Sequence, residues 1–404
     1  MMASQPSHVP RHRAQQQITP KGILVTSTPP AILVLADGRV FRGVGFGATG
    51  TTLGEADFTT AMTGYQETMT DPSYHRQIVV ATAPQIGNTG WNDEDGESHG
   101  DKIWVAGLVI RDLAHHASNW RATRSLEDEM RAQGIVGIRG VDTRALVRHV
   151  RNHGSIAAGL FSGEDAQRPE AELLATVKAQ PSMAGSDLAG DVSTDDTYVV
   201  EPEGEQRFTV VAYDMGIKTN TPRNFVQRGI RTIVVPANTP YEDIMRHNPD
   251  GVFVSNGPGD PATADEMVAV VREVLANKIP FFGICFGNQI LGRALGMNTY
   301  KLKFGHRGIN VPVINHDTGT IDITAQNHGF ALEGTAGEVF DTPFGPAKVT
   351  HTCLNDGVVE GVALLDGTAY SVQYHPEAAA GPHDANPLFD QFIELLEARQ
   401  EGNK

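Results

Sequence analysis

The 404-residue sequence contains only two cysteines, Cys285 and Cys353, and no C-x-x-C pair. Neither a framework of disulfide bonds nor a structural zinc site with cysteine ligands can therefore explain these thiols. The H-E-x-x-H pattern is also absent, and we expect no metal on this chain. No G-x-x-x-x-G-K-[ST] phosphate cradle occurs, which predicts that ATP is not bound here.

Long apolar runs and an excess of basic residues are missing as well. No apolar segment approaches the roughly 20 residues that cross a bilayer, and the N-terminal residues lack the apolar core of a secretory signal. Asp and Glu number 48 against 32 Lys and Arg, which gives a formal net charge of -16. This charge repels nucleic-acid phosphates and anionic lipids. We therefore expect a protein of the reducing cytoplasm, where a free thiol survives, without a nucleic-acid or membrane partner.

The length and the 40% hydrophobic content suit two globular domains. Residues 1–30 are polar and without periodicity, which predicts a flexible tail. Residues 31–190 combine β-type runs with helical patterns and predict an α+β domain, whereas the polar stretch 191–207 predicts a linker. In residues 208–400, short apolar runs alternate with helical segments. This alternation is typical of βα units, so the predicted fold class is α/β, with a mostly parallel central sheet in the second domain.

Cys285 lies in the run PFFGICFGNQ, between a strand-like segment and a predicted helix, with Gly283 and Gly287 on either side. A sharp strand-to-helix turn strains its middle residue and needs small neighbours, which is the geometry of a nucleophile elbow. The N–H groups and the dipole of the following helix would stabilise a thiolate. Taken alone, however, a G-x-C-x-G pattern more often marks a buried structural cysteine.

The run AYSVQYHPE places His375 and Glu377 at the end of another predicted strand. Pro376 keeps His375 extended, so the side chains of His375 and Glu377 should point the same way. A thiol nucleophile needs such a base, together with a carboxylate that orients the ring and stabilises its protonated form. A histidine near a glutamate is by itself more often a surface pair.

The run SNGPGDP at residues 255–261 directly follows the predicted strand GVFV. Its glycines and prolines favour an irregular turn that brings backbone N–H groups close to a neighbour. Ligands of such sheets bind outside the carboxyl ends of the strands, where this loop lies. The turn and the N–H group of Phe286 could together form an oxyanion hole. An ordinary strand-to-helix turn is the plainer interpretation of the run in isolation.

Taken together, GICFGNQ, SNGPGDP and HPE resemble the class I, or triad, glutamine amidotransferase family. That family hydrolyses the side-chain amide of glutamine through a γ-glutamyl thioester and passes ammonia to a synthase. The resemblance implies that Cys285 is the nucleophile, His375 the general base and then acid, and Glu377 the orienting carboxylate. Family members often read GICLGHQ, so Phe286 and Asn288 depart from the pattern, and Asn288 replaces a group that can titrate.

Other runs are similar to the small subunit of carbamoyl-phosphate synthetases, namely KLKFGHRG and ITAQNHGF late in the chain and AMTGYQETMTDPSY, IGNTG, GLVIRDL and VDTR earlier. This resemblance spans residues 31–398 and implies a glutaminase subunit for arginine and pyrimidine biosynthesis. It implies a large-subunit partner that binds ATP and Mg²⁺, in a heterodimer or a higher oligomer of that pair. The implied contacts with L-glutamine are Ser73, Gly257, Gly259, Phe286, Gln289, Asn327, Gly329 and Phe330.

Three alternatives remain open. The chain could be another triad amidotransferase, such as an anthranilate- or GMP-forming kind, although the first domain argues against this. It could be a cysteine elbow hydrolase that cleaves esters without a partner, or a non-catalytic scaffold subunit. The G-x-G-x-x-G run at residues 45–50 does not open a helix and is set aside as a dinucleotide site. We interpret Cys353 as a bystander thiol and His328 as a structural hydrogen-bonding residue.

Overall fold

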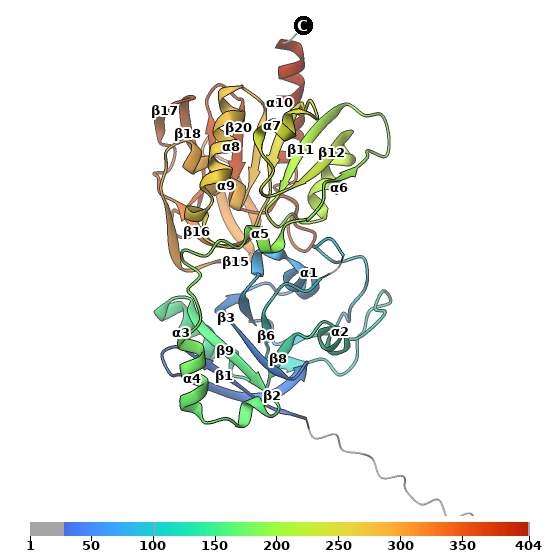
Figure 1. The fold of residues 1–404 in the computed structure, drawn as a ribbon, viewed down its shortest axis with the longest axis vertical. Helices are drawn as coiled ribbons and strands as arrows, with labels where there is room; N and C mark the ends of the chain where they lie inside the picture. The colour runs from blue at the N-terminus through green and yellow to red at the C-terminus, as the bar shows by residue number, and fades with distance from the viewer. Residues whose placement is uncertain (1–27, 101, 403–404) are drawn as a thin grey trace, which may run out of the picture.

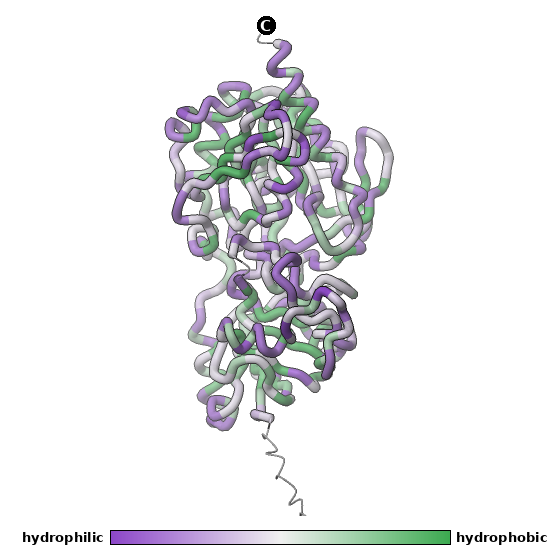
Figure 2. Tube along the Cα trace, turned by 90° about the vertical axis from the view of Figure 1, so that its right-hand side faces the viewer, coloured by the Kyte–Doolittle hydropathy of each residue, from purple (hydrophilic) through white to green (hydrophobic). Residues whose placement is uncertain are grey.

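The computed structural model describes residues 28–100 and 102–402, which form two lobes stacked along the long axis (Figure 1). The predicted tail lies, as far as residue 27, outside the described residues. The fold is mixed α/β, with an N-terminal domain followed by a domain built on a large sheet, which confirms the predicted fold class. Figure 2 shows apolar segments running through the interior of each lobe and polar segments in the outer loops.

The N-terminal lobe is built on a closed barrel, which in the described part of the chain has seven strands. The first two strands pair antiparallel across the Asp37-Gly38 turn, as the sequence predicts. Closure leaves the barrel without a free sheet edge. In barrel order the strands are β1 (Pro30–Leu35), β2 (Val40–Gly47), β8 (Val136–Arg139), β6 (Gly107–Val109), β4 (Gln77–Ala81), β3 (Gly50–Thr59) and β9 (Ile156–Ser162).

Short helices pack around this barrel, and their ends follow ordinary capping rules. The longest begins after Asp142, whose carboxylate accepts a hydrogen bond from the Ala145 N–H at 2.9 Å, and ends at Gly154 with φ 100°. A two-stranded sheet, β5 (Gln85–Ile86) with β7 (Asp112–Leu113), lies beside them. The helices are α1 (Tyr65–Thr70), α2 (Leu126–Ala132), α3 (Thr143–His153) and α4 (Glu170–Lys178), with the 3₁₀ turns η1 (Pro72–Tyr74) and η2 (Asp165–Gln167).

The C-terminal lobe is built on one twisted sheet, which has eleven strands among the described residues. Its central strands are parallel, and antiparallel strands flank them on both sides. The predicted linker, 191–207, contributes the edge strand β10. In sheet order the strands are β10 (Tyr198–Val200), β12 (Ile230–Pro236), β11 (Phe208–Asp214), β13 (Gly251–Val254), β14 (Phe281–Ile284), β20 (Ala369–Val372), β19 (Val359–Leu364), β18 (Gly345–Cys353), β15 (Thr299–Asn315) and β16 (Ile321–Leu332), and β17 (Val339–Thr342) pairs with β18.

Helices cover both faces of the parallel part of this sheet. Alternate residues of each strand point to opposite faces, so Val211 packs under α8 and α9 whereas Val210 packs against α6 and α10. No helix among the described residues is both long and apolar enough to cross a membrane. The helices are α5 (Ala189–Val192), α6 (Asn220–Val226), α7 (Tyr241–Met245), α8 (Asp265–Ala276), α9 (Phe286–Ala294) and α10 (Leu388–Gly402), with the 3₁₀ turn η3 (Pro261–Thr263).

Charged side chains connect the two lobes where β3 lies against β15. Arg307 and Asp57 form a buried ion pair with an N–O distance of 3.0 Å, and Lys301 and Glu55 form a second pair at 2.5 Å. Burial raises the pKa of Asp57 to about 6, although Arg307 opposes the shift. The loops after β11 and β13 also face the N-terminal lobe, because Lys218 pairs with Asp71 and Asn256 donates to Ser73.

Candidate active site

Cys285 occupies the sharp turn between β14 and α9, as the sequence predicts. Its backbone has φ 55° and ψ -97°, a conformation that L residues rarely adopt and that costs on the order of 1–3 kcal/mol. The flanking glycines make this turn possible. A Cβ atom on Gly283 would lie 2.7 Å from the Gly287 carbonyl, and one on Gly287 would lie 2.2 Å from the Val254 carbonyl oxygen.

His375 and Glu377 form a buried pair in the loop after β20. The ring nitrogen Nδ1 of His375 lies 2.6 Å from the Glu377 carboxylate, so that carboxylate fixes the orientation of the ring. The other ring nitrogen, Nε2, has no well-aligned hydrogen-bond partner among the described residues. The ring nevertheless lies close enough to the Cys285 sulfur to interact with it. The Cys285 sulfur, the His375 ring and the Glu377 carboxylate are therefore neighbours in that order, as a thiol nucleophile, its base and an orienting carboxylate would be.

The electrostatics of this group favour a protonated His375. Burial and the Lys218 ammonium both disfavour protonation, but Glu377 and the Cys285 sulfur outweigh them and raise the pKa of His375 to about 10. Glu377 shows the reverse effect, because His375 and Lys218 overcome its burial and lower its pKa. A ring that holds a proton at neutral pH is ready to protonate a leaving group.

The glycines of the 255–261 loop allow its backbone to approach closely. A Cβ atom on Gly257 would lie 2.1 Å from the Met215 carbonyl oxygen, and Gly259 has φ 97°. Within the described residues, no hydrogen bond engages the backbone N–H groups of Gly257 and Phe286. Free N–H groups on both sides of a nucleophile are suited to an oxyanion.

Cys285 opens into a pocket of about 400 Å³ between the two lobes, which we call the Cys285 pocket. It contains all of the predicted glutamine contacts except Phe286, which follows Cys285 at the start of α9. His375 lines a neighbouring cavity, and Glu377 is buried behind it. The pocket is lined by Glu55, Ser73, Gln77, Met183, Gly257, Pro258, Gly259, Cys285, Gln289, Arg307, Asn327, His328, Gly329 and Phe330.

Ser73 reaches this pocket from the N-terminal lobe. Asp71 caps the 3₁₀ turn η1 by accepting a hydrogen bond from the Ser73 N–H at 2.9 Å, and Asn256 Nδ2 donates to the Ser73 hydroxyl at 2.9 Å. Asn327 Nδ2 donates to the other Asp71 oxygen at 3.0 Å, and the Asn327 carbonyl accepts the Cys285 thiol at 3.7 Å. The N-terminal lobe thus helps to enclose the Cys285 pocket of the C-terminal lobe.

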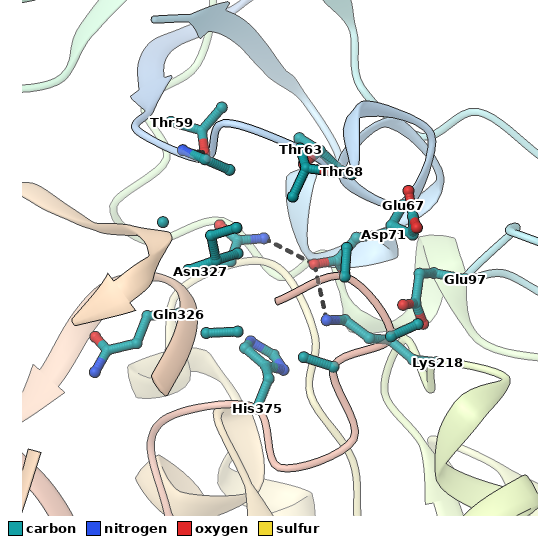
Figure 3. A pocket seen from close by; sticks show the side chains of 18 of the residues that line it. Thr59, Thr63, Glu67, Thr68, Asp71, Glu97, Lys218, Gln326, Asn327 and His375 are labelled. Carbon is teal, nitrogen blue, oxygen red and sulfur yellow. Dashed lines mark hydrogen bonds and ion pairs between the residues drawn. The ribbon is translucent and has the colours of Figure 1, made fainter. Parts of the chain in front are cut away.

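A second cavity, of about 460 Å³, adjoins the Cys285 pocket at Asn327 (Figure 3). We call it the acidic cavity, because carboxylates from the first lobe surround the single ammonium group of Lys218. Lys218 Nζ lies 3.6 Å from both the Asp71 and the Glu377 carboxylates. Burial would lower the pKa of Lys218, but these carboxylates raise it. Burial also raises the pKa of Glu97 to about 7.

Asn288, the departure from the usual family run, belongs to a buried amide network behind the pocket. It accepts a hydrogen bond from the Ser371 hydroxyl at 2.9 Å and donates to Gln373 Oε1 at 3.2 Å. The same Gln373 oxygen accepts from Gln289 Nε2 at 3.1 Å, and Gln289 also donates to the Phe330 carbonyl at 2.9 Å. Because these bonds hold the NH₂ group of the Gln289 side chain, its side-chain amide oxygen is available to accept a hydrogen bond from a ligand in the pocket.

In the described part of the chain, two overlapping groups of possible metal ligands share His306, namely His306 with His328 and Glu360, and His306 with Cys353 and Asp356. His306, His328 and Glu360 each offer an atom within 4.8 Å of the others, and no ion is present. Burial disfavours a charged His306, but hydrogen bonds with Asp356 and Glu360 raise its pKa to about 9. A protonated ring cannot bind a metal, so the donor set fits an ion pair better. His328 donates to the Phe330 carbonyl at 2.8 Å and supports the strand.

Cys353 provides a contrast to Cys285. It is buried at the end of β18, away from the Cys285 pocket, and burial raises the pKa of its thiol to about 12. A thiol of this kind stays protonated at neutral pH and is a poor nucleophile.

Several buried polar residues of the site escape the sequence motifs. Asp71 is only two residues before Ser73, and Lys218 lies in the loop after β11. The rule that ligands bind at the carboxyl ends of parallel strands could have singled out Lys218. Gln373 lies two residues before His375 in the run AYSVQYHPE, so the alternation of side chains along a strand could have pointed to it. Glu97 lies in a run without a distinctive spacing, and we find no signal in the sequence that points to it.

The fold and this arrangement define a class of protein. The model of the class-I glutamine amidotransferase family matches residues 211–395, and that of the carbamoyl-phosphate synthase small chain, CPSase domain, matches residues 33–160. The first domain thus distinguishes this chain from amidotransferases that lack it.

Individual relatives agree over nearly the whole chain. A carbamoyl phosphate synthase small chain from Corynebacterium diphtheriae is 81% identical over 370 residues, which cover 92% of this chain and 98% of that protein. Those of Corynebacterium glutamicum and Mycobacterium tuberculosis are 75% and 69% identical, covering 94% and 91% of this chain and 97% and 98% of theirs. The chain belongs to the family of carbamoyl-phosphate synthase small chains.

Proposed function

We propose that this chain hydrolyses L-glutamine to glutamate and ammonia through a thioester on Cys285, and delivers the ammonia to a large subunit that makes carbamoyl phosphate. Membership of the small-chain family supports this assignment. The observation that carries it is the strained Cys285 turn beside the His375–Glu377 pair, at the floor of an enclosed polar pocket.

In the first step, the Cys285 thiol passes its proton to His375, and the resulting thiolate attacks the amide carbon of glutamine. The developing oxyanion accepts hydrogen bonds from the N–H groups of Phe286 and of the glycine turn at Gly257. His375, which holds a proton at neutral pH, gives it to the amide nitrogen as the C–N bond breaks. The products are ammonia and a γ-glutamyl thioester.

In the second step, water replaces the sulfur. His375, now neutral, removes a proton from the water, whose oxygen attacks the thioester carbon, and the C–S bond breaks with return of the electron pair to sulfur. Glutamate leaves. Glu377 stays ionised throughout, because His375 and Lys218 stabilise its charge, and it holds the ring for both transfers.

The proposed glutamine contacts are polar groups from both lobes. Ser73 from the first lobe and Gln289, Asn327 and the glycines from the second surround the space above Cys285. A substrate that bridges the lobes would couple their positions to the chemistry. This is useful in an enzyme that should release ammonia only when its partner is ready.

Ammonia is proposed to leave through the acidic cavity. This cavity adjoins the Cys285 pocket at Asn327 and is lined by His375, the residue that protonates the leaving nitrogen. The large subunit, with ATP and Mg²⁺, would bind over its outlet as a heterodimer or a higher oligomer of that pair. The product would serve arginine and pyrimidine biosynthesis in the cytoplasm.

The test is to purify the chain with any large ATP-binding protein that accompanies it and to compare substrates. Glutamine-dependent and ammonium-dependent synthesis of carbamoyl phosphate are both expected, with little hydrolysis of simple esters. Ester hydrolysis without glutaminase activity would favour a cysteine elbow hydrolase. The absence of both, together with failure of a glutamine-like chloroketone to label Cys285, would indicate a scaffold subunit.

A further inference from the structure

The Cys285 pocket needs a route for glutamine, because Cys285 itself is only 1% exposed. A larger cavity, of about 760 Å³, shares Glu55 and Met183 with it. We call it the Arg76 cavity, and it is lined by Gly54, Glu55, Arg76, Ser155, Ile156, Ala157, Gln180, Pro181, Ser182, Met183, Ser186 and Lys301.

We propose that the Arg76 cavity is the vestibule through which glutamine enters, with Arg76 attracting the substrate carboxylate and Met183 and the Glu55–Lys301 ion pair forming the gate. This inference rests on the proposed glutaminase function and adds a binding site to it. The shared residues place the gate between the cavity and Cys285.

The charges of the cavity suit an amino-acid carboxylate. Arg76 and Lys301 are opposed only by Glu55, and Lys301 already pairs with Glu55 at 2.5 Å. In the described part of the chain, no carboxylate lies within ion-pair distance of Arg76. A guanidinium without a carboxylate partner, in the lining of a cavity, attracts an anionic group by charge and by paired hydrogen bonds.

The acidic cavity is a poorer entrance. Its two cations, Lys218 and protonated His375, already pair with carboxylates, so neither is free to attract the carboxylate of an incoming amino acid. A neutral ammonia molecule needs no such partner. The two cavities therefore differ in whether they hold a cation without a carboxylate partner, as expected if one admits the substrate and the other releases a small neutral product.

The gate residues come from segments that join the lobes. Met183 lies on the chain between the two domains and packs with Leu188 and Phe330, of which Phe330 lines the Cys285 pocket. Glu55 is on β3 and Lys301 on β15, so their ion pair spans the interface. Lys301 is 28% exposed and Glu55 12%, so the pair is only partly buried, and the substrate carboxylate would take the place of Glu55 beside Lys301 as the passage opens.

The experiment obstructs the vestibule in the intact complex. Ser182 is an exposed lining residue, whereas Ala184, two residues on, is equally exposed but does not line the cavity. Ser182→Trp is expected to lower kcat/KM for glutamine about tenfold with kcat at saturation unchanged, and Ala184→Trp to change neither. Ammonium-dependent synthesis and the unfolding midpoint should be the same in both variants.

A charge variant gives an independent readout. Arg76→Gln should lower kcat/KM for glutamine several-fold at low ionic strength and progressively less as salt is added. The exposed Arg148 on α3 provides the matched control, Arg148→Gln, which should have no such effect.

The proposal is overturned if Ser182→Trp behaves like Ala184→Trp, or if obstructing the acidic cavity with Thr63→Trp raises KM for glutamine instead. In either case glutaminase activity of the unaltered complex would leave the proposed function standing. If the unaltered complex hydrolyses no glutamine, the function and this vestibule are both wrong.

Discussion

The acidic cavity and the Arg76 cavity both adjoin the Cys285 pocket, and they differ in charge and in size. The Arg76 cavity holds Arg76, Lys301 and Glu55 in about 760 Å³, whereas the acidic cavity holds Lys218 among carboxylates in about 460 Å³. Both are formed jointly by the two lobes. The difference teaches that the N-terminal lobe is part of the proposed catalytic apparatus, since it supplies charged residues to each side.

The contribution of the first lobe also differs chemically between the two cavities. On the acidic side, Asp71 connects Lys218 to Asn327, whose carbonyl accepts the Cys285 thiol. On the Arg76 side, Glu55 connects to Lys301 near the surface. The acidic side is thus buried and hydrogen-bonded close to Cys285, and the Arg76 side is more exposed, as a gate requires.

The largest effect is expected from replacing Cys285, which lies in the pocket that both cavities adjoin. Cys285→Ser should lower glutamine-dependent synthesis about 10³-fold or more, because a serine hydroxyl beside His375 is a much weaker nucleophile. Synthesis from added ammonium should persist. Steady-state assays of the complex with each nitrogen source provide the measurement, and Cys353→Ser is the control that should leave both activities intact.

If ammonium-dependent synthesis fell together with the glutamine-dependent reaction, the division of labour between this chain and its partner would be wrong. The unfolding midpoint of Cys285→Ser would show whether misfolding is the cause. Relief of backbone strain is not expected, since Ser has a Cβ atom as Cys does.

Obstruction of the acidic cavity should separate hydrolysis from transfer. Thr63 lines this cavity near its rim, and Thr63→Trp should increase the glutamate formed per carbamoyl phosphate, because ammonia escapes before it is used. KM for glutamine should stay the same, in contrast to Ser182→Trp. The ratio of the two products, measured in one reaction, tests this, with the exposed Thr318→Trp as the control.

An unchanged ratio in Thr63→Trp, with full synthesis, would mean that ammonia takes another path. The acidic cavity would then have no role in the transfer of ammonia.

The buried amide network around Asn288 should affect both stability and the binding of glutamine in the Cys285 pocket. Asn288→Leu leaves the buried Ser371 hydroxyl without its acceptor and Gln373 Oε1 with only the Gln289 donor, which should lower the free energy of unfolding by about 1–3 kcal/mol. The Gln289 side chain should then change its orientation. KM for glutamine should therefore rise severalfold, with little change in ammonium-dependent synthesis. Urea unfolding and glutaminase kinetics measure the two effects.

Asn288→Asp keeps the acceptor for Ser371 but removes the donor to Gln373, so its KM should lie between those of the native chain and of Asn288→Leu. A normal KM in Asn288→Leu would show that Gln289 does not need this support.

The smallest effect concerns the ion pairs of His306 with Asp356 and Glu360. His306 has a pKa raised to about 9 from its ordinary value of 6.5, so the folded state holds this proton more tightly. Its contribution to stability is fully present below pH 6.5 and is lost as the pH rises through 9. His306→Gln should remove at most about 3 kcal/mol below that window and little above it.

Urea unfolding of both proteins across this pH range measures the difference. The exposed His247→Gln is the control and should show no comparable trend. A constant difference between native and His306→Gln proteins would mean that His306 is not protonated in the folded state.

The sequence predicts the parts of the site that depend on local backbone chemistry. Gly283 and Gly287 indicate the turn at Cys285, because a side chain at either position would collide with a carbonyl group. Pro376 indicates the extended backbone that brings Glu377 to His375. Each of these inferences needs only the few residues around it.

The remainder depends on contacts between distant segments. The Lys218–Asp71 pair and the Arg307–Asp57 pair join the two lobes, and no spacing along the chain encodes which lysine meets which carboxylate. The closed barrel is equally a product of long-range pairing, in which β1 meets β9. The edge strand β10 lies in a stretch too polar to be recognised as a strand.

The most direct test of the central claim is to trap the intermediate. The complex is mixed with glutamine, quenched in acid within its first turnovers and digested, and the peptides that carry the two thiols are weighed. A γ-glutamyl adduct is expected on the Cys285 peptide, and Cys353 should remain unmodified. An adduct on Cys353, or hydrolysis of glutamine in a Cys285→Ala complex, would contradict the account.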